Sequence, residues 1–146
     1  MKFVRYLTPA ILFASLLLGC GGGSTSSGTS LNLNGTWLLN PHATSQSISF
    51  NSFQAVLQQS GNTVTSQIVD SSNPPGTVAC STGVATITGT VAGNTFNGQL
   101  TTSASTTTFS VSGNSASLSG TFSTHFHSGP CASAGIVTGT VTVAKV

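Results

Sequence analysis

From residue 31 onward, apolar and polar residues alternate in short runs with a period of two, and no stretch repeats with the period of a helix. Alternation of this kind is typical of β-strands that place one face on a core and the other in water. We therefore expect an all-β domain. The runs predict about eight strands, over residues 34–39, 45–58, 63–70, 77–91, 94–102, 105–112, 115–127 and 135–145, and the fourth of these has room for a break near Cys80.

Three turns between these runs share one form, with a small residue followed by glycine and asparagine. They are Ser60-Gly61-Asn62, Ala92-Gly93-Asn94 and Ser112-Gly113-Asn114. Glycine and asparagine accept the positive φ angles that tight hairpins require, so each turn predicts a reversal between adjacent antiparallel strands. The expected topology is an up-and-down meander.

Glycine stands at the midpoint of the apolar face in several of the predicted strands. A glycine inside a strand costs stability unless the backbone bends sharply or packs closely at that point. Its recurrence at similar places on neighbouring strands predicts that the meander curls into a small closed barrel, which also removes exposed sheet edges. A sandwich of two sheets is the alternative. The segments concerned are Ile87-Gly89-Val91, Phe96-Gly98-Leu100, Leu118-Gly120-Phe122 and Val137-Gly139-Val141.

The first 19 residues have the composition of a secretory signal peptide. Lys2 and Arg5 precede an apolar run over residues 7–18 that contains no charge. This run is shorter than the roughly 20 residues that a helix needs to cross a bilayer, and no second such run follows. We expect the chain to be exported, with no membrane-spanning segment in its mature part.

The segment Leu17-Leu18-Gly19-Cys20 resembles the lipobox of bacterial lipoproteins. The resemblance implies cleavage before Cys20 and acylation of its thiol, which would anchor the protein to the membrane. Gly21 stands where retention in the inner membrane would require aspartate in many such proteins, so the resemblance favours the outer membrane. Residues 21–30 contain only Gly, Ser and Thr, which predicts a flexible tether with a reach of about 17 Å. The expected organisation is a signal over 1–19, an anchor and tether over 20–30 and a barrel over 31–146.

Charge is almost absent from the predicted domain. Between residues 31 and 146, Asp70 is the only acid and Lys145 the only lysine or arginine. A basic phosphate-binding surface cannot be built from this composition, so we expect no nucleic-acid partner. Surface polarity must come from Ser, Thr, Asn and Gln.

Cysteine usage predicts one disulfide. If Cys20 carries lipid, Cys80 and Cys131 are the two remaining thiols in an oxidising compartment and have a single possible pairing. Closing a loop of about 50 residues would stabilise the fold by roughly 4 kcal/mol in the chain-entropy model. A redox-active or metal-binding pair is the alternative, but the two residues lack the close spacing of such sites.

The opening of the first predicted strand carries a second resemblance. Asn34-Gly35-Thr36-Trp37 is similar to the Gly-x-Trp opening of lipocalins and the Gly-Thr-Trp opening of avidin-like proteins, both eight-stranded barrels that hold small ligands. In those families the tryptophan packs across one end of the barrel. The chain lacks the lipocalin motif with Thr-Asp-Tyr, a late arginine to stack over Trp37, and the several tryptophans of biotin sites. Biotin binding is therefore not implied, and Trp37 can equally be a plain core anchor.

Catalysis is not expected. One carboxylate excludes the paired acid and base of glycosidases, and a Ser-His-Asp arrangement would have to use Asp70 without any Gly-x-Ser-x-Gly turn. We expect Asp70 to cap a turn beside residues 71–76. No cofactor is expected either.

His125 and His127 are the remaining candidates for metal chemistry. Strand alternation places both on one face, with Phe122 and Phe126 on the other. Two imidazoles could approach one ion, but only His42 or Asp70 could add a strong ligand. The favoured interpretation is a pair of solvent-facing histidines opposite a buried aromatic face, with no metal site.

Two functions from different classes follow. One is a barrel that binds a small apolar or neutral ligand in a cavity lined by aromatic residues; the other is a structural or interaction module with a filled core, whose hydroxyl-rich surface meets protein or glycan. The volume of the interior separates them. A third function, inhibition of an envelope enzyme, would use the loop over residues 74–80. The candidate cavity residues are Trp37, Phe50, Phe53, Phe96, Phe109, Phe122 and Phe126.

Overall fold

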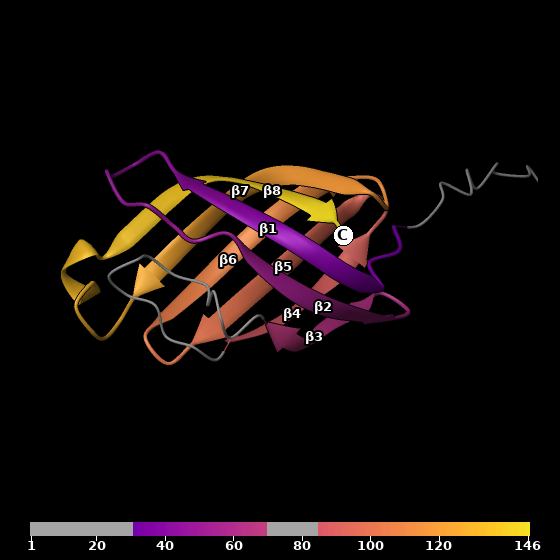
Figure 1. The fold of residues 1–146 in the computed structure, drawn as a ribbon, viewed down its shortest axis with the longest axis horizontal. Helices are drawn as coiled ribbons and strands as arrows, with labels where there is room; N and C mark the ends of the chain where they lie inside the picture. The colour runs from indigo at the N-terminus through magenta and orange to yellow at the C-terminus, as the bar shows by residue number, and fades with distance from the viewer. Residues whose placement is uncertain (1–30, 70–84) are drawn as a thin grey trace, which may run out of the picture.

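Eight antiparallel strands follow one another in chain order around a closed barrel (Figure 1). The structure is a computed structural model, and it describes residues 31–69 and 85–146. Because β1 pairs with β8, the ring is complete, which confirms the predicted up-and-down barrel and shows that the sandwich alternative is wrong. The strands are β1 (Gly35–Ala43), β2 (Phe53–Ser60), β3 (Thr63–Val69), β4 (Ala85–Ala92), β5 (Thr95–Thr102), β6 (Ser105–Gly113), β7 (Ser117–Phe126) and β8 (Ile136–Lys145); a short 3-10 turn, η1 (Ala132–Ala134), precedes β8.

The second strand begins later than predicted. It was expected from residue 45, but β2 begins at Phe53, and residues 45–52 form an irregular segment instead. β1 is longer than predicted: it ends at Ala43 instead of residue 39 and includes Pro41. Beyond Leu39 this strand pairs only with β8, so one side of its backbone is open and tolerates a residue without an N–H. Residues 77–84 of the fourth predicted strand lie outside the described residues.

Two of the three predicted hairpin turns have the expected form. Gly61 and Gly93 adopt positive φ angles of 58° and 61° in two-residue turns, and no non-glycine residue in the described ranges has a positive φ. The third turn differs, because Gly113 still pairs within the β6–β7 ladder. There the side chain of Asn114 makes the turn, with its Oδ1 accepting from the backbone N–H groups of Ala116 and Ser117 at 2.9 and 3.0 Å.

Glycine and phenylalanine form one row across β4 to β8, near the middle of each strand. Cross-strand pairing joins Gly89 to Gly98, Gly98 to Phe109, Phe109 to Phe122, and Phe122 to Gly139. A Cβ atom on Gly98 would lie 2.5 Å from Phe109 Cζ, and one on Gly139 would lie 2.7 Å from Phe122 Cε1. Each ring therefore occupies the space that the neighbouring glycine leaves. We call this row the waist.

Gly120 was expected at an equivalent place but lies outside the waist. It pairs with Val111 rather than with a waist residue, two positions from Phe122 along β7. A Cβ there would collide with the backbone carbonyl oxygen of Ser110, so the absence of a side chain allows a close backbone approach.

One end of the barrel is closed by the residues that precede β1. Leu31 and Leu33 are buried, and the Trp37 indole Nε1 donates to the Leu33 carbonyl at 2.8 Å. The Gln59 side chain accepts from the Leu33 N–H at 2.8 Å and donates to the Leu31 carbonyl at 3.0 Å. The turns at Gly61 and Gly93 and the C-terminus lie at the same end, which we call the N-terminal end (Figure 1). The opposite end, the loop end, carries the segments over residues 44–52 and 127–135.

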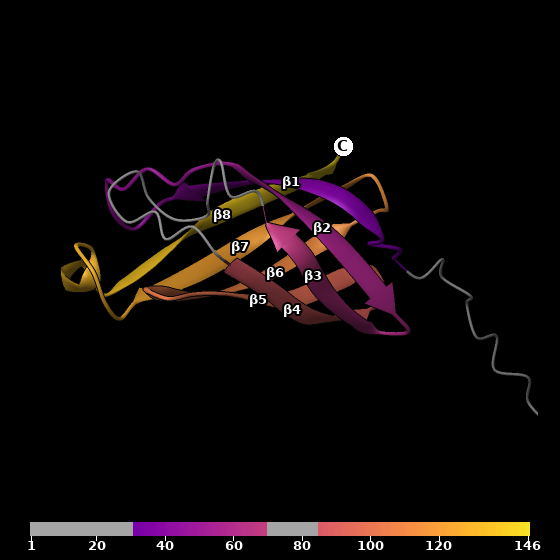
Figure 2. The same ribbon diagram turned by 60° about the horizontal axis from the view of Figure 1, so that its bottom comes forward.

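The β3–β4 pairing is the shortest around the ring. It joins only Thr63–Thr65 to Thr88–Thr90 (Figure 2). The register between β2 and β3 shifts after Val56, which places a β-bulge in β3, and bulges bend a strand away from its partner. Where the ladder stops, Ser66 Oγ accepts from the Ile87 N–H at 2.7 Å.

We expect the waist to behave as one packing unit. Gly98→Ala should lower the free energy of unfolding by about 1–3 kcal/mol, because the new methyl forces the Phe109 ring out of place. In the double variant Gly98→Ala/Phe109→Leu the clash is removed, so its loss should be smaller than the sum of the single losses by about 0.5–3 kcal/mol. Urea denaturation of Gly98→Ala, Phe109→Leu and the double variant measures the three losses. Thr101→Ala, on the exposed face of β5, is the control and should change the free energy of unfolding by less than about 0.5 kcal/mol. Additive effects of Gly98→Ala and Phe109→Leu would contradict the proposed packing.

Candidate functional site

Among the described residues, a small apolar cavity lies inside the barrel towards the loop end. Its volume is about 40 Å³, whereas sites for drug-sized ligands usually measure about 300–1,000 Å³. Four of the seven aromatic residues expected to line a cavity do so, namely Phe50, Phe53, Phe109 and Phe122. The other lining residues, which the sequence did not single out, are Leu39, Pro41, Leu100, Ser105, Thr107, Thr124 and Val141.

Aromatic packing explains why so little interior space remains. The Phe50 ring meets Phe122 edge to face, with centroids 5.1 Å apart, and stacks near Phe126 at 6.3 Å. The Phe96 ring meets Phe109 edge to face at 5.4 Å. Phe96 and Phe126 thus fill the core on either side of the cavity without lining it.

The buried hydroxyl groups beside this cavity are satisfied by one another. Thr107 Oγ1 and Thr124 Oγ1 are 2.7 Å apart, and Thr102 Oγ1 and Ser105 Oγ are 3.0 Å apart. These protein hydroxyl groups are therefore already paired and are not available to a ligand in the cavity.

Trp37 closes the N-terminal end and does not reach the cavity. Its side chain is fully buried, and Lys145 Nζ lies 5.7 Å from the ring centroid, in a cation–π arrangement. The chain has no late arginine to stack over Trp37, but a late lysine takes that place, because closure of the barrel pairs Trp37 with Lys145. Gly35 makes room for it: its φ is +119°, and a Cβ would lie 3.2 Å from Lys145 Cε.

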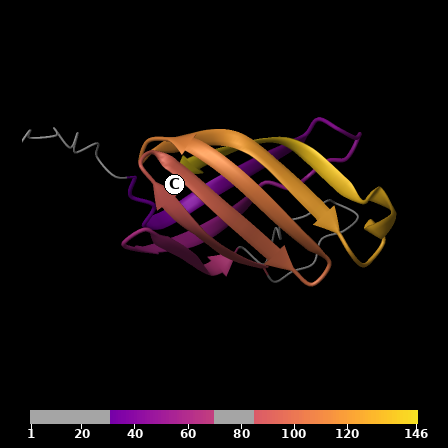
Figure 3. The same cartoon turned by 180° about the vertical axis from the view of Figure 1, so that it is seen from behind.

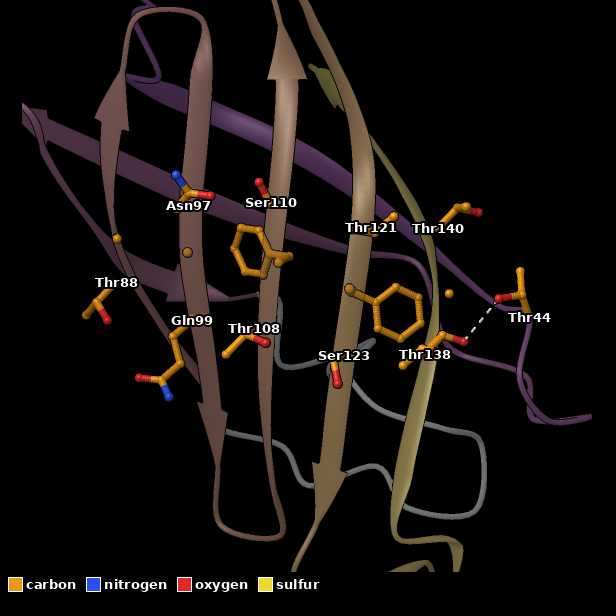
Figure 4. A pocket seen from close by; sticks show the side chains of 15 residues that line it. Thr44, Thr88, Asn97, Gln99, Thr108, Ser110, Thr121, Ser123, Thr138 and Thr140 are labelled. Atoms are coloured by element: carbon orange, nitrogen blue, oxygen red, sulfur yellow. Dashed lines mark hydrogen bonds between the residues drawn. The ribbon is translucent and has the colours of Figure 1, made fainter.

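A hollow lies on the outside of the barrel, across strands β4 to β8. Figure 3 shows this side of the sheet from behind. The hollow is an open groove with a volume of about 800 Å³. The waist forms its floor, and a row of polar side chains stands on each side (Figure 4). The upper row consists of Asn97, Ser110, Thr121 and Thr140; the lower row consists of Thr88, Gln99, Thr108, Ser123 and Thr138, and Thr44 stands at its end.

Cross-strand register keeps the two rows straight. In the lower row Gln99 pairs with Thr88 on one side and Thr108 on the other, and in the upper row Ser110 pairs with Asn97 and Thr121. With about 4.8 Å between strands, five strands give a groove about 19 Å long. The rows lie two residues apart along each strand, or about 7 Å.

The side chains in the two rows of the groove are polar and uncharged, and they flank a floor of glycine and phenylalanine. Hydroxyl and carboxamide groups line the rows, and no acidic, basic or histidine side chain does so. Lys145, the one acidic or basic side chain apart from histidine in the ranges 31–69 and 85–146, lies at the N-terminal end with Trp37. Acid–base or metal chemistry has no donor here, so the arrangement favours binding through hydrogen bonds.

The sequence predicted a hydroxyl-rich surface but not a groove on it. A usable signal was present, because three interior glycines are flanked by outward polar residues in Thr88-Gly89-Thr90, Asn97-Gly98-Gln99 and Thr138-Gly139-Thr140. Their alignment into one row depends on strand register, which the sequence alone did not specify.

The histidines and Cys131 lie at exposed or half-buried positions. His125 and His127 are exposed, while Phe126 between them is buried. His42 is exposed on β1. Within the described residues no group of three or more potential ligands could hold a metal ion. Asp70, Cys20 and Cys80 lie outside these residues, so the turn at Asp70, the lipidation of Cys20 and the pairing of Cys80 with half-buried Cys131 stay predictions.

Comparison of the chain with protein-family models, with curated proteins and with solved structures found no match. In the part of the chain that the structure describes, no helix has the length and apolar character needed to cross a membrane.

Proposed function

We propose that the protein is an exported, lipid-anchored module of the bacterial cell envelope that engages its partner through the outer groove. The contrast between the two hollows carries this proposal: the groove measures about 800 Å³, and the interior cavity about 40 Å³. A barrel whose inside is filled by aromatic rings offers its binding surface on the outside. The absence of titratable side chains along the groove supports binding rather than catalysis.

The anchor rests on the sequence. Leu17-Leu18-Gly19-Cys20 follows a signal-like apolar run, and Gly21 favours sorting to the outer membrane. The tether over residues 21–30 would join the barrel at its N-terminal end, where Leu31 and Leu33 are fixed. That attachment would leave the groove on the side wall and accessible from the envelope space.

The anchor predicts fatty-acid labelling at one residue. When cells expressing the full chain are fed an alkyne fatty acid, the wild type should be labelled and recovered with membranes, because acylated cysteine partitions into lipid. Cys20→Ser should lose the label and leave the membrane fraction. Cys131→Ser is the control and should keep its label. Labelling of the Cys20→Ser protein would refute lipidation at this residue.

The groove predicts position-dependent cross-linking. A photo-reactive amino acid at Ser110, in the upper row, should give a covalent adduct with envelope material in intact cells, because a bound partner excludes water there. The same amino acid at Gln54, exposed on β2, is the matched control and should give no adduct. Equal yields at the two positions, or none at Ser110, would show that the groove is not the contact surface.

A small apolar ligand inside the barrel is a second candidate function. It is favoured by the apolar lining of the cavity and by Phe50, which is half-buried on the irregular segment over residues 45–52. Movement of this ring would enlarge the cavity from the loop end.

Native mass spectrometry separates the two functions. We expect the purified lipoprotein to have the mass of the acylated chain alone, because the closed interior leaves too little room for a ligand. An additional non-covalent mass that disappears in Leu100→Phe, which fills the cavity, would establish the second function instead. Thr101→Ala, on the outer face of β5, serves as the control.

A further inference from the structure

We propose that the outer groove binds a neutral polysaccharide chain laid across strands β4 to β8; this inference rests on the proposed function of the groove. Charge is the first reason. No charged or histidine side chain lines the groove, so an anionic polymer would find no counter-charge and a cationic one no carboxylate. A neutral chain matches the groove without any charged group losing its hydration.

Unused hydrogen-bonding capacity is the second reason. Apart from Thr44, whose Oγ1 donates to the Thr138 carbonyl at 3.4 Å, the groove side chains make no side-chain hydrogen bond with other described residues. Some polar side chains elsewhere on the barrel bond internally, as Thr95 does with Ser112 and Gln59 with Leu31. The groove therefore presents hydroxyls and carboxamides that both donate and accept, as the hydroxyl groups of a sugar do.

The shape of the groove is the third reason. It is open, about 19 Å long by strand spacing, and bounded by two rows about 7 Å apart. Successive sugar rings of an extended chain advance by a distance similar to the spacing between strands, so one ring can lie over each strand. Asn97 and Gln99 flank Gly98 on β5, the second of the five strands, and would hold one such ring from both sides.

A protein partner fits this surface less well. Strands β5 to β8 are paired on both sides in the ring, so an extended peptide finds no free strand edge to extend at the groove. The rows also lack the exposed aromatic or arginine side chains that usually anchor protein interfaces.

The test is binding of the full-length lipoprotein to four neutral polysaccharides, namely hydroxyethyl cellulose, laminarin, dextran and galactomannan, measured by affinity electrophoresis and calorimetry. At least one should bind, with little dependence on salt. Asn97→Ala/Gln99→Ala should weaken that binding at least tenfold, because it removes both carboxamides of the groove. Gln54→Ala/Gln58→Ala removes two exposed carboxamides from β2 and should leave binding within twofold of the wild type.

Thermal melting of both double variants establishes that they fold, since all four residues are exposed. Binding to none of the four polysaccharides, or equal binding by Asn97→Ala/Gln99→Ala and the wild type, would overturn the inference. A protein adduct at Ser110 without polysaccharide binding would leave the groove as a contact surface and reject the glycan. No adduct at Ser110 would reject the proposed function itself.

Discussion

The packing of phenylalanine rings against glycine at the waist is the constraint on which the rest of the barrel depends. Eight strands enclose a narrow interior, so a ring from one strand fits only where its neighbour has no side chain. Phe109 faces Gly98 and Phe122 faces Gly139 in this way. The same row of glycine and phenylalanine fills the inside and forms the floor of the outer groove.

This constraint leaves a cavity of only about 40 Å³ towards the loop end. A cavity for a small molecule needs small side chains facing one another across the interior, whereas here Phe50, Phe96 and Phe126 add rings above and below the waist. Hydrophobic packing of this density stabilises a domain that has almost no charged residues and cannot rely on ion pairs. Hydroxyl and carboxamide groups face the solvent instead of charges, and we propose that they supply recognition.

At the N-terminal end, the short motif around Trp37 predicted one part of the closure but not the other. Gly35 and Trp37 were predicted as the opening of a barrel, and Trp37 does close that end. Lys145, which lies over the same ring, could not be assigned from its local sequence because it is more than a hundred residues away. The predicted start of the second strand at residue 45 was wrong, because alternation of serine with apolar residues does not distinguish a strand from an irregular segment.

The sequence by itself determined the fold class, the order of the strands and two of the three hairpin turns, because alternation and glycine at positive φ are local properties of the chain. Tertiary structure decided what the barrel offers to a partner. Whether seven aromatic residues enclose a cavity or fill it depends on register, since a ring and a glycine complement each other only when closure places them opposite one another. The groove has the same origin, because its two rows come from five strands that are separated in the sequence but adjacent in the sheet.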